Sequence, residues 1–325
     1  MMSIRSEMIG FGHYLPAKVL TNDDLSEMVE TNDEWIRTRT GICQRHIAEN
    51  ETTSVIAGKA AIMALQNAKV APQDVDLLIL ATVTPDNTTP ACSVKIARDL
   101  GLRVGVPAFD ISAACSGFVY ALTLADNMIR LGQVKTAVVI GAECLSKIVD
   151  WTDRNTCVLF GDGAGAVVLR AGDGVGNSAD TGVLSTCIYA DGNQYDNLKT
   201  TGGVSSTQNS GFVAMNGKEV FKHAVVSLSE AAENALDKAG LSKSDVDWLI
   251  PHQANIRIIE SVGERLGLPE EKVIVTVDHH GNTSAASIPL ALSENIEAGR
   301  LHKGDVVVLT AMGAGFTWGG AVVRL

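Results

Sequence analysis

The chain has 325 residues, of which 46% are hydrophobic and 19% charged, a composition typical of a compact and ordered protein. Its 31 glycines are spread along the sequence, which argues against disorder and against a collagen-like chain. The formal net charge of −11 argues against nucleic acid as the main partner, although local basic patches remain compatible with it.

The sequence also predicts the cellular location of the protein. No apolar run reaches the roughly 18 residues that a membrane span requires, and residues 1–20 do not resemble a signal peptide. The six cysteines form no C-x-x-C pair, so we expect reduced thiols, most of them buried as small hydrophobic residues. We therefore expect a cytoplasmic protein that has neither a membrane nor a nucleic acid as partner.

An internal repeat is the most informative feature that the sequence shows by itself. Residues 59–79 (KAAIMALQNAKVAPQDVDLLI) align without a gap with residues 230–250 (EAAENALDKAGLSKSDVDWLI). Similar segments follow in the same order, pairing 93–102 with 261–268 and 135–143 with 304–313. This ordered similarity predicts a duplication. The halves are 1–175 and 176–325, with their junction in the glycine-rich stretch 171–182.

Each half is predicted to alternate helices and strands. Helical spacing of Ala, Ile and Leu runs through 55–69 and 220–239. Continuous apolar runs predict strands buried on both faces, at 77–82, 106–111, 137–140, 248–250, 273–277 and 306–310. Two β/α halves that share one core predict a layered α/β fold.

Cys115 stands where a strand is expected to turn into a helix, in AFDISAACSGFVYALTLADNMI. The free N–H groups and the macrodipole at a helix N-terminus favour a thiolate, which is the nucleophilic form of cysteine. The neighbours Ala113, Ala114, Ser116 and Gly117 are small and let a substrate approach closely. We therefore expect Cys115 to be a nucleophile, and an ordinary buried cysteine is the alternative.

His252 follows an apolar strand in DWLIPHQANIRII and precedes a helix that begins near Asn255. Sites in α/β proteins usually form at the carboxyl ends of strands. In the duplicated frame this loop is equivalent to residues 84–86 of the first half. We expect a catalytic histidine here, the alternative being a histidine of the core or surface with its hydrogen bonds satisfied.

Asn282, in VTVDHHGNTSAASIPLAL, belongs to the second half's counterpart of the Cys115 elbow. If a pseudo-twofold axis relates the halves, Asn282 and Cys115 face each other across it. An ordinary Asx turn is the alternative. We assign no catalytic role to the neighbouring His279 and His280.

A glycine-rich loop is expected near the end of the sequence, in TAMGAGFTWGGAVVRL. Backbone N–H groups of Gly313, Ala314 and Gly315 are suited to hold the oxyanion of a tetrahedral intermediate. A plain glycine turn between two strands is the alternative.

Several longer segments resemble a known family, the β-ketoacyl-acyl-carrier-protein synthase III enzymes that initiate type II fatty-acid synthesis. The most specific combination is PHQAN (251–255) with HGNTSAAS (280–287), preceded by the cysteine elbow DISAACSGF (110–118). The likeness also covers 31–42, 152–169, 215–225 and 313–321. It implies a thiolase-like fold, with two duplicated β/α halves forming a layered αβαβα architecture.

The resemblance implies a decarboxylating Claisen condensation in two stages. Cys115 attacks an acyl-CoA primer (acetyl-CoA or similar) and releases CoA, while the N–H groups of Cys115 and Ala314 hold the oxyanion. Malonyl-ACP then binds and loses CO2, and His252 Nε2 and the Asn282 amide hydrogen-bond the enolate oxygen. The carbanion attacks the acyl-cysteine and gives 3-oxoacyl-ACP. Neither a metal nor a redox cofactor is implied.

The resemblance also implies binding residues and partners. Trp35 and Arg154 would sandwich the CoA adenine by stacking and cation–π contacts. The other implied CoA contacts are Thr31, Arg39, Gly217 and Asn255. The residues proposed to attract the acidic carrier protein are Lys222, Arg257 and Arg265, for each of which a solvated surface role is the alternative. A homodimer is expected from the family.

Three positions depart from the family pattern. Met312 stands where a phenylalanine often precedes the glycine loop, and Thr89 where some members place a bulky phenylalanine in the acyl pocket. Both changes predict a wider or softer pocket, because methionine adapts its shape readily. Ala314 replaces a glycine of the loop. The primer, whether acetyl, branched or longer, stays open.

Other readings fit the sequence less well. A thiolase needs a second cysteine near the last glycine loop, but the last cysteine is Cys187. Elongating synthases have two catalytic histidines, plant-type polyketide synthases have longer chains, and a specialised starter enzyme is the same-class alternative. The hypothesis of a nucleotide-binding oxidoreductase has only the glycine run GDGAGA (161–166) in its favour, and this run lacks the βαβ context of a dinucleotide-binding motif. A non-catalytic acyl-binding protein has no need of all three of Cys115, His252 and Asn282.

Overall fold

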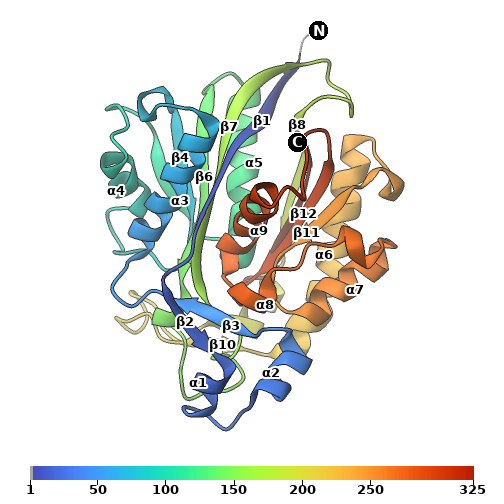
Figure 1. Cartoon of the computed structure of the whole chain (residues 1–325). Helices are drawn as coiled ribbons and strands as arrows, with labels where there is room; N and C mark the ends of the chain where they lie inside the picture. Colours follow the sequence, from blue (N-terminus) through green and yellow to red (C-terminus); the bar gives the residue numbers. More distant parts are fainter. Residues whose placement is uncertain (1–2) are drawn as a thin grey trace.

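A five-stranded sheet holds most of the first half in the computed structural model, which describes residues 3–325 (Figure 1). Its strands are, in spatial order, β1 (Ser3–Tyr14), β7 (Asp162–Gly174), β6 (Thr136–Cys144), β4 (Leu77–Ala81) and β5 (Ala108–Ile111). Strand β4 pairs in parallel with β5 and β6, whereas β7 is antiparallel to both β6 and β1. Every residue of β4 and β6 is buried, as the continuous apolar runs predicted.

A four-stranded sheet holds the second half. Its strands are, in spatial order, β11 (Trp248–Pro251), β12 (Val306–Gly313), β13 (Thr317–Arg324) and β8 (Gly182–Ala190). The chain passes between the sheets after Gly174, where the sequence predicted the junction. One hydrophobic core nevertheless contains buried residues of both sheets, such as Ile79 and Leu309. The division into 1–175 and 176–325 therefore stays a prediction.

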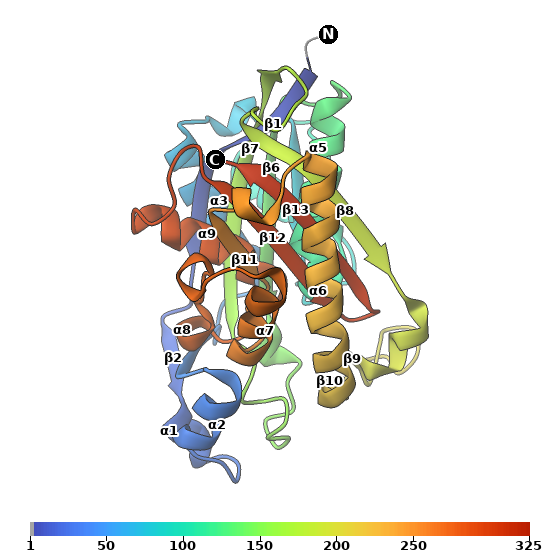
Figure 2. The same ribbon diagram turned by 90° about the vertical axis from the view of Figure 1, so that its right-hand side faces the viewer.

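Helices cover and separate the two sheets, and the layered αβαβα fold is confirmed (Figures 1 and 2). Helices α5 and α9 lie between the sheets, α3 and α4 cover the first sheet, and α6 covers the second beside α7. Their bounds are α3 (Thr53–Ala68), α4 (Cys92–Asp99), α5 (Gly117–Arg130), α6 (Gly217–Ala239), α7 (Ile256–Leu266) and α9 (Ser287–Glu297). Among residues 3–325, no helix is long and apolar enough to cross a bilayer.

Short elements complete the fold, and several of them gather at one end of the sheets (Figure 1). The helices are α1 (Asn22–Ser26), α2 (Asp33–Thr40) and α8 (Val277–His280), and two small ribbons pair β2 (Lys18–Thr21) with β3 (Gln44–Ile47) and β9 (Leu198–Thr200) with β10 (Val213–Met215). Single 3-10 turns are η1 (Pro72–Asp74), η2 (Ala114–Ser116), η3 (Leu145–Lys147), η4 (Gly192–Asn197), η5 (Lys243–Asp245), η6 (Glu270–Lys272) and η7 (Ser284–Ala286). Figure 1 shows α1, α2, β2, β3 and β10 gathered at this end.

The sequence repeat has the same structure in both halves: a helix, a 3-10 turn and a parallel strand. The repeated aspartate explains part of this likeness. Asp76 accepts the backbone N–H of Thr136 (3.0 Å) through its carboxylate, and Asp247 accepts that of Val306 (2.8 Å). Each aspartate thus fixes the start of the strand beside it, β6 in one half and β12 in the other.

The predicted strand at 273–277 is wrong. This segment makes only an isolated bridge between Leu249 and Val273, and α8 begins at Val277. The reason is the buried Gln253 side chain, whose Oε1 accepts the N–H groups of Thr276 (2.8 Å) and Val277 (3.2 Å). A side-chain amide thus makes hydrogen bonds to the backbone that a neighbouring strand would otherwise have made.

Close packing of α9 on β7 yields a stability prediction. A Cβ at Gly165 would lie 2.4 Å from Leu290 N and 2.5 Å from Pro289 C, both backbone atoms of α9. We expect Gly165→Ala to lower the free energy of unfolding by about 2–3 kcal/mol, because neither backbone segment has room to move. Gly58→Ala is the matched control. It meets open space within helix α3 and should raise that free energy by about 0.5–1 kcal/mol.

Denaturant unfolding followed by circular dichroism measures both changes. Equal stability of the two variants would contradict the close approach of α9 to β7.

Candidate active site

One cavity of about 860 Å³ contains the three residues that the sequence singled out. Its wall includes Cys115, His252 and Asn282, together with the loop at Gly313–Gly315. These residues come from both halves of the chain and from four separate connections between elements. The structure therefore brings together residues that lie up to 200 positions apart.

Cys115 lies in the 3-10 turn η2, between β5 and α5. The preceding Ala114 has a φ of +45°, a left-handed conformation that is uncommon for a residue with a side chain. Burial raises the pKa of the Cys115 thiol to about 12, and a hydrogen bond from Ser284 partly opposes that rise. Burial therefore opposes the thiolate that the helix end is expected to favour.

Glu143 is a buried carboxyl group near the thiol that the sequence analysis missed. It is the penultimate residue of β6. Its carboxylate accepts hydrogen bonds from the Thr84 hydroxyl (2.7 Å), the Val83 N–H (3.1 Å) and the Ser284 hydroxyl (3.2 Å). Burial raises its pKa to about 7, and its charge in turn raises the pKa of Cys115. Only the isolated acid in the apolar run TAVVIGAEC (136–144) could have signalled it.

The Asn282 elbow repeats the geometry of the Cys115 elbow. Ser284 has a φ of +50° and begins the turn η7, as Ala114 does in η2. The two turns are in contact, since a Cβ built on Gly117 would lie 3.4 Å from Ala285 Cβ. The elbows therefore face each other, as the duplication predicted.

The Asn282 amide is oriented by its own turn. Its Oδ1 accepts the Ser284 N–H (2.9 Å), which leaves the Nδ2 hydrogens to point elsewhere. Its backbone is fixed as well: the N–H donates to Leu159 O (2.8 Å), and the carbonyl accepts the Gly161 N–H (3.1 Å). Asn282 is thus a rigidly held hydrogen-bond donor in the wall of the cavity.

His252 is held as a neutral imidazole. It is 3% exposed, and burial lowers its pKa to about 3. Its Nδ1 lies 2.7 Å from the Ser287 hydroxyl, and that hydroxyl already accepts the Gln253 N–H (3.4 Å). The hydroxyl can donate its own hydrogen to Nδ1, and in that tautomer the ring proton lies on Nε2. Sequence reasoning missed Ser287 as the residue that orients the ring.

The glycine loop between β12 and β13 touches the backbone of the nucleophile. A Cβ on Gly313 would lie 2.5 Å from Cys115 N, so only glycine permits this approach. The Thr317 hydroxyl lies 3.1 Å from Ala113 O and 3.0 Å from Ala314 O, and so links the loop to the elbow. This contact places Ala314 beside Cys115, and the oxyanion role of their N–H groups stays a prediction.

Four of the six predicted CoA residues line the cavity. They are Trp35, Arg39, Gly217 and Asn255, whereas Thr31 and Arg154 do not line it. The guanidinium carbons of Arg39 and Arg154 lie 4.4 Å and 5.4 Å from the Trp35 ring centroid. For a purine to stack between Trp35 and Arg154, the ring and the guanidinium must be about 7 Å apart, which is twice a van der Waals contact of ~3.5 Å. Arg154 therefore has to move outward when a purine binds.

The three predicted carrier-protein residues are exposed on α6 and α7. Lys222 lies 4.0 Å from Glu219, and the Arg257 guanidinium lies 5.4 Å from the Phe221 ring, which lines the cavity. Arg265 follows near the end of α7. Lys222 and Arg257 therefore lie near the cavity, and the docking role stays a prediction.

Only one of the two predicted acyl-pocket residues lines the cavity. Met312 does so and is buried, whereas Thr89 is exposed and does not line the cavity of this single chain. The preceding segment is anchored on α3 and α4, since Asp86 accepts the Ser54 N–H (2.9 Å) and the Lys95 ammonium (2.8 Å). The role of Thr89 in the acyl pocket stays a prediction.

Comparisons with known proteins agree with this geometry. The family model for 3-oxoacyl-[acyl-carrier-protein] synthase III matches residues 109–192, and the model for its C-terminal part matches 236–325. A β-ketoacyl-[acyl-carrier-protein] synthase III of Rhodospirillum centenum is 59% identical over 99% of this chain and 100% of its own. A second, of Paramagnetospirillum magneticum, is 57% identical over the full length of both. The crystal structure of 3-oxoacyl-[acyl-carrier-protein] synthase III from Aquifex aeolicus has a TM-score of 0.92, at 48% identity, and covers 98% of this chain and 100% of that one.

We predict that the charge of Glu143 lowers the reactivity of the Cys115 thiol. Glu143→Gln keeps the size of the side chain but removes the charge that raises the thiol's pKa. We expect a pKa about 0.5–1 unit lower, and hence alkylation of Cys115 by iodoacetamide about three- to tenfold faster. The gain should appear above pH 7, where wild-type Glu143 is ionised, and vanish well below it.

Asp126→Asn is the matched control, since Asp126 is a buried carboxyl group bonded instead to Ser6 (2.7 Å). Its alkylation rate should equal that of the wild type. If Glu143→Gln reacts no faster than Asp126→Asn at any pH, Glu143 does not control the thiol.

Proposed function

Because the chain belongs to the β-ketoacyl-acyl-carrier-protein synthase III family, we propose that it condenses an acyl-CoA primer with malonyl-ACP. The products are 3-oxoacyl-ACP, CoA and CO2. The family's members are condensing acyltransferases of fatty-acid synthesis. The observation that carries the proposal is the meeting of Cys115, His252 and Asn282 in one cavity.

In the first stage the Cys115 sulfur attacks the thioester carbon of the acyl-CoA. The bond from carbon to the CoA sulfur breaks, and the proton of the Cys115 thiol leaves with CoA, so that one thiol replaces another. The raised pKa of Cys115 keeps the thiol protonated until a substrate arrives. The N–H groups of Cys115 and Ala314 are proposed to hold the oxyanion, since their backbones lie side by side.

In the second stage malonyl-ACP loses CO2 as negative charge develops on its thioester oxygen. His252 Nε2 and Asn282 Nδ2 are proposed to donate hydrogen bonds to that oxygen, and both donors are held in place before the substrate arrives. The resulting carbanion attacks the acyl carbon on Cys115. A carbon–carbon bond forms, the bond to the Cys115 sulfur breaks, and the sulfur recovers a proton from solvent.

The surroundings of the cavity support two different acyl carriers as substrates. Trp35 and Arg154 offer a stacking site for the adenine of CoA, which the carrier protein's arm lacks. Lys222 and Arg257 offer positive charge near the cavity for an acidic carrier protein, on a chain whose net charge is −11. We propose a cytoplasmic homodimer. The condensation as written balances without a metal or redox cofactor.

Asn282 should act in the second stage only. Asn282→Ala should leave acylation of Cys115 by acyl-CoA within about twofold of wild type but slow CO2 release from malonyl-ACP about 100-fold or more. Intact-protein mass spectrometry with a panel of acyl-CoAs follows the first stage, and a chase with malonyl-ACP follows the second. Asn282→Asp tests the donor specifically, because it keeps an oxygen for the Ser284 N–H and removes the amide hydrogens.

Two outcomes would contradict the proposed function. The absence of an acyl adduct on the Cys115 peptide would contradict the acyl-enzyme intermediate. Equal losses of rate in both stages of the Asn282→Ala variant would contradict the role assigned to Asn282.

Trp35 should affect only the substrate that carries adenine. Trp35→Ala is expected to raise KM for acyl-CoA about tenfold, a loss of about 1.4 kcal/mol, and to leave KM for malonyl-ACP unchanged. Steady-state kinetics with each substrate varied in turn measures both constants. An equal rise in the two KM values would indicate a general distortion of the cavity instead of a lost adenine contact.

A further inference from the structure

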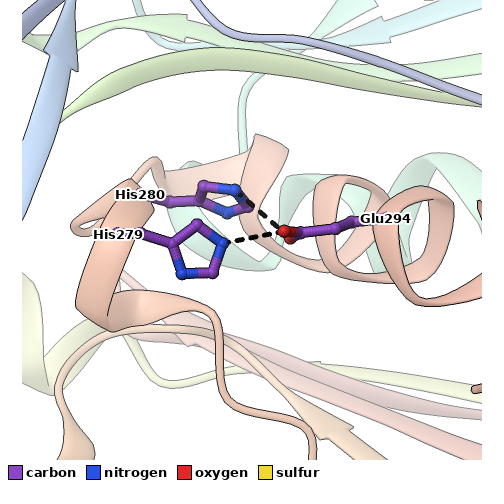
Figure 3. Close-up of side chains that lie close together, drawn as sticks. All are labelled: His279, His280 and Glu294. Carbon is purple, nitrogen blue, oxygen red and sulfur yellow. Dashed lines mark hydrogen bonds and ion pairs between the residues drawn. The ribbon is translucent and has the colours of Figure 1, made fainter. Parts of the chain in front are cut away.

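Two imidazoles and a carboxylate converge next to the segment that carries Asn282, yet none of them lines the cavity (Figure 3). His279 and His280 end helix α8, and Glu294 projects from α9. His279 Nε2 lies 2.9 Å from Glu294 Oε1, and His280 Nε2 lies 3.3 Å from Glu294 Oε2. The three ligand atoms all lie within 4.8 Å of one another. No local sequence pattern predicts this cluster, because Glu294 belongs to a different helix from the two histidines.

The cluster leaves polar atoms unsatisfied. The His280 side chain is 3% exposed, and Glu294 Oε2, which faces it, is buried and makes no hydrogen bond within residues 3–325. An unpaired buried oxygen is costly in a native protein and calls for a partner. A cation bound by His280 Nε2 and Glu294 Oε2 would satisfy this oxygen.

Asp278 gives His279 the orientation of a metal ligand. Its Oδ1 lies 2.8 Å from His279 Nδ1, so Nδ1 carries a proton and Nε2 faces Glu294. Histidines that bind metals usually donate their second ring N–H to a carboxylate in this way. His279 and Glu294 are 36% and 37% exposed, so an ion can enter from solvent and water can complete its coordination.

We propose that His279, His280 and Glu294 bind a divalent first-row transition-metal ion, with Zn²⁺ as the best-fitting ion. Imidazole and carboxylate together favour zinc, cobalt or nickel over magnesium and calcium. Zinc–ligand bonds of about 2.0–2.1 Å in tetrahedral geometry place ligand atoms roughly 3.3 Å apart. His279 Nε2 and His280 Nε2 lie 2.9 and 3.3 Å from different oxygens of Glu294, and the three ligand atoms lie within 4.8 Å of one another, so the side chains have to draw together around the ion. The ion replaces the proton between His279 Nε2 and Glu294 Oε1, and that proton passes to solvent.

The site's position gives it a consequence for the fold. The ion would join α8 to α9, the two elements on either side of residues 281–286. That segment contains Asn282, and α9 begins with Ser287, which orients His252. Metal binding should therefore stabilise the part of the chain that holds both donors.

Titration of the chelator-treated, full-length protein with Co²⁺ and Zn²⁺ tests the proposal. We expect one equivalent of Co²⁺ to bind with the visible absorption of a four-coordinate site. Zn²⁺ should displace it and raise the melting temperature by about 2 °C or more. His279→Gln and Glu294→Gln should weaken binding at least about tenfold. Both side chains are partly exposed, so we expect these variants to fold, which far-ultraviolet circular dichroism checks.

Two further variants locate the bound ion. His302→Gln alters an exposed histidine in another loop, and Cys115→Ser removes the thiol of the cavity; both should bind Co²⁺ as the wild type does. The proposal is overturned if the wild type binds no ion, if His279→Gln binds as tightly as His302→Gln, or if Cys115→Ser alone abolishes binding. None of these results depends on condensing activity.

Discussion

The contact between the two elbows is the constraint on which the site depends. Ala114 and Ser284 both adopt left-handed backbone angles, and the turns that they begin pack together where Gly117 meets Ala285. Ala285 also packs closely against β6, where a Cβ on Gly141 would collide with Ala285 O. Large side chains at these contacts would separate Cys115 from Asn282. The duplication thus supplies two matching turns, and close packing makes one site from them.

Burial of this site sets the charge of its groups. The same exclusion of water that raises the pKa of Cys115 to about 12 lowers that of His252 to about 3. At neutral pH the resting site therefore holds a neutral thiol and a neutral imidazole, with the ionisable Glu143 beside them. Fixed hydrogen-bond donors in such surroundings stabilise developing charge strongly, because little solvent competes with them.

The sequence predicted the repeated elements because they depend on local patterns. It also placed Cys115, His252 and Asn282 at the ends of elements, which the structure brings together in one cavity. The aspartates at 76 and 247 and the apolar runs after them mark the same helix–strand unit twice. The prediction of a strand at 273–277 was wrong because the Gln253 side chain accepts backbone N–H groups at the end of this segment. Glu143 and Ser287 were missed because their importance comes from tertiary contacts, and no local pattern marks them.

The central claim is that Cys115 carries acyl transfer, while His252 and Asn282 carry decarboxylation. Release of labelled CO2 from malonyl-ACP by a Cys115→Ala variant tests it most directly. The account predicts that this variant still releases CO2 and yields acetyl-ACP without condensation product, because both donors and their supports remain in place. Loss of CO2 release to the level of the Asn282→Ala variant would contradict the separation of the two stages.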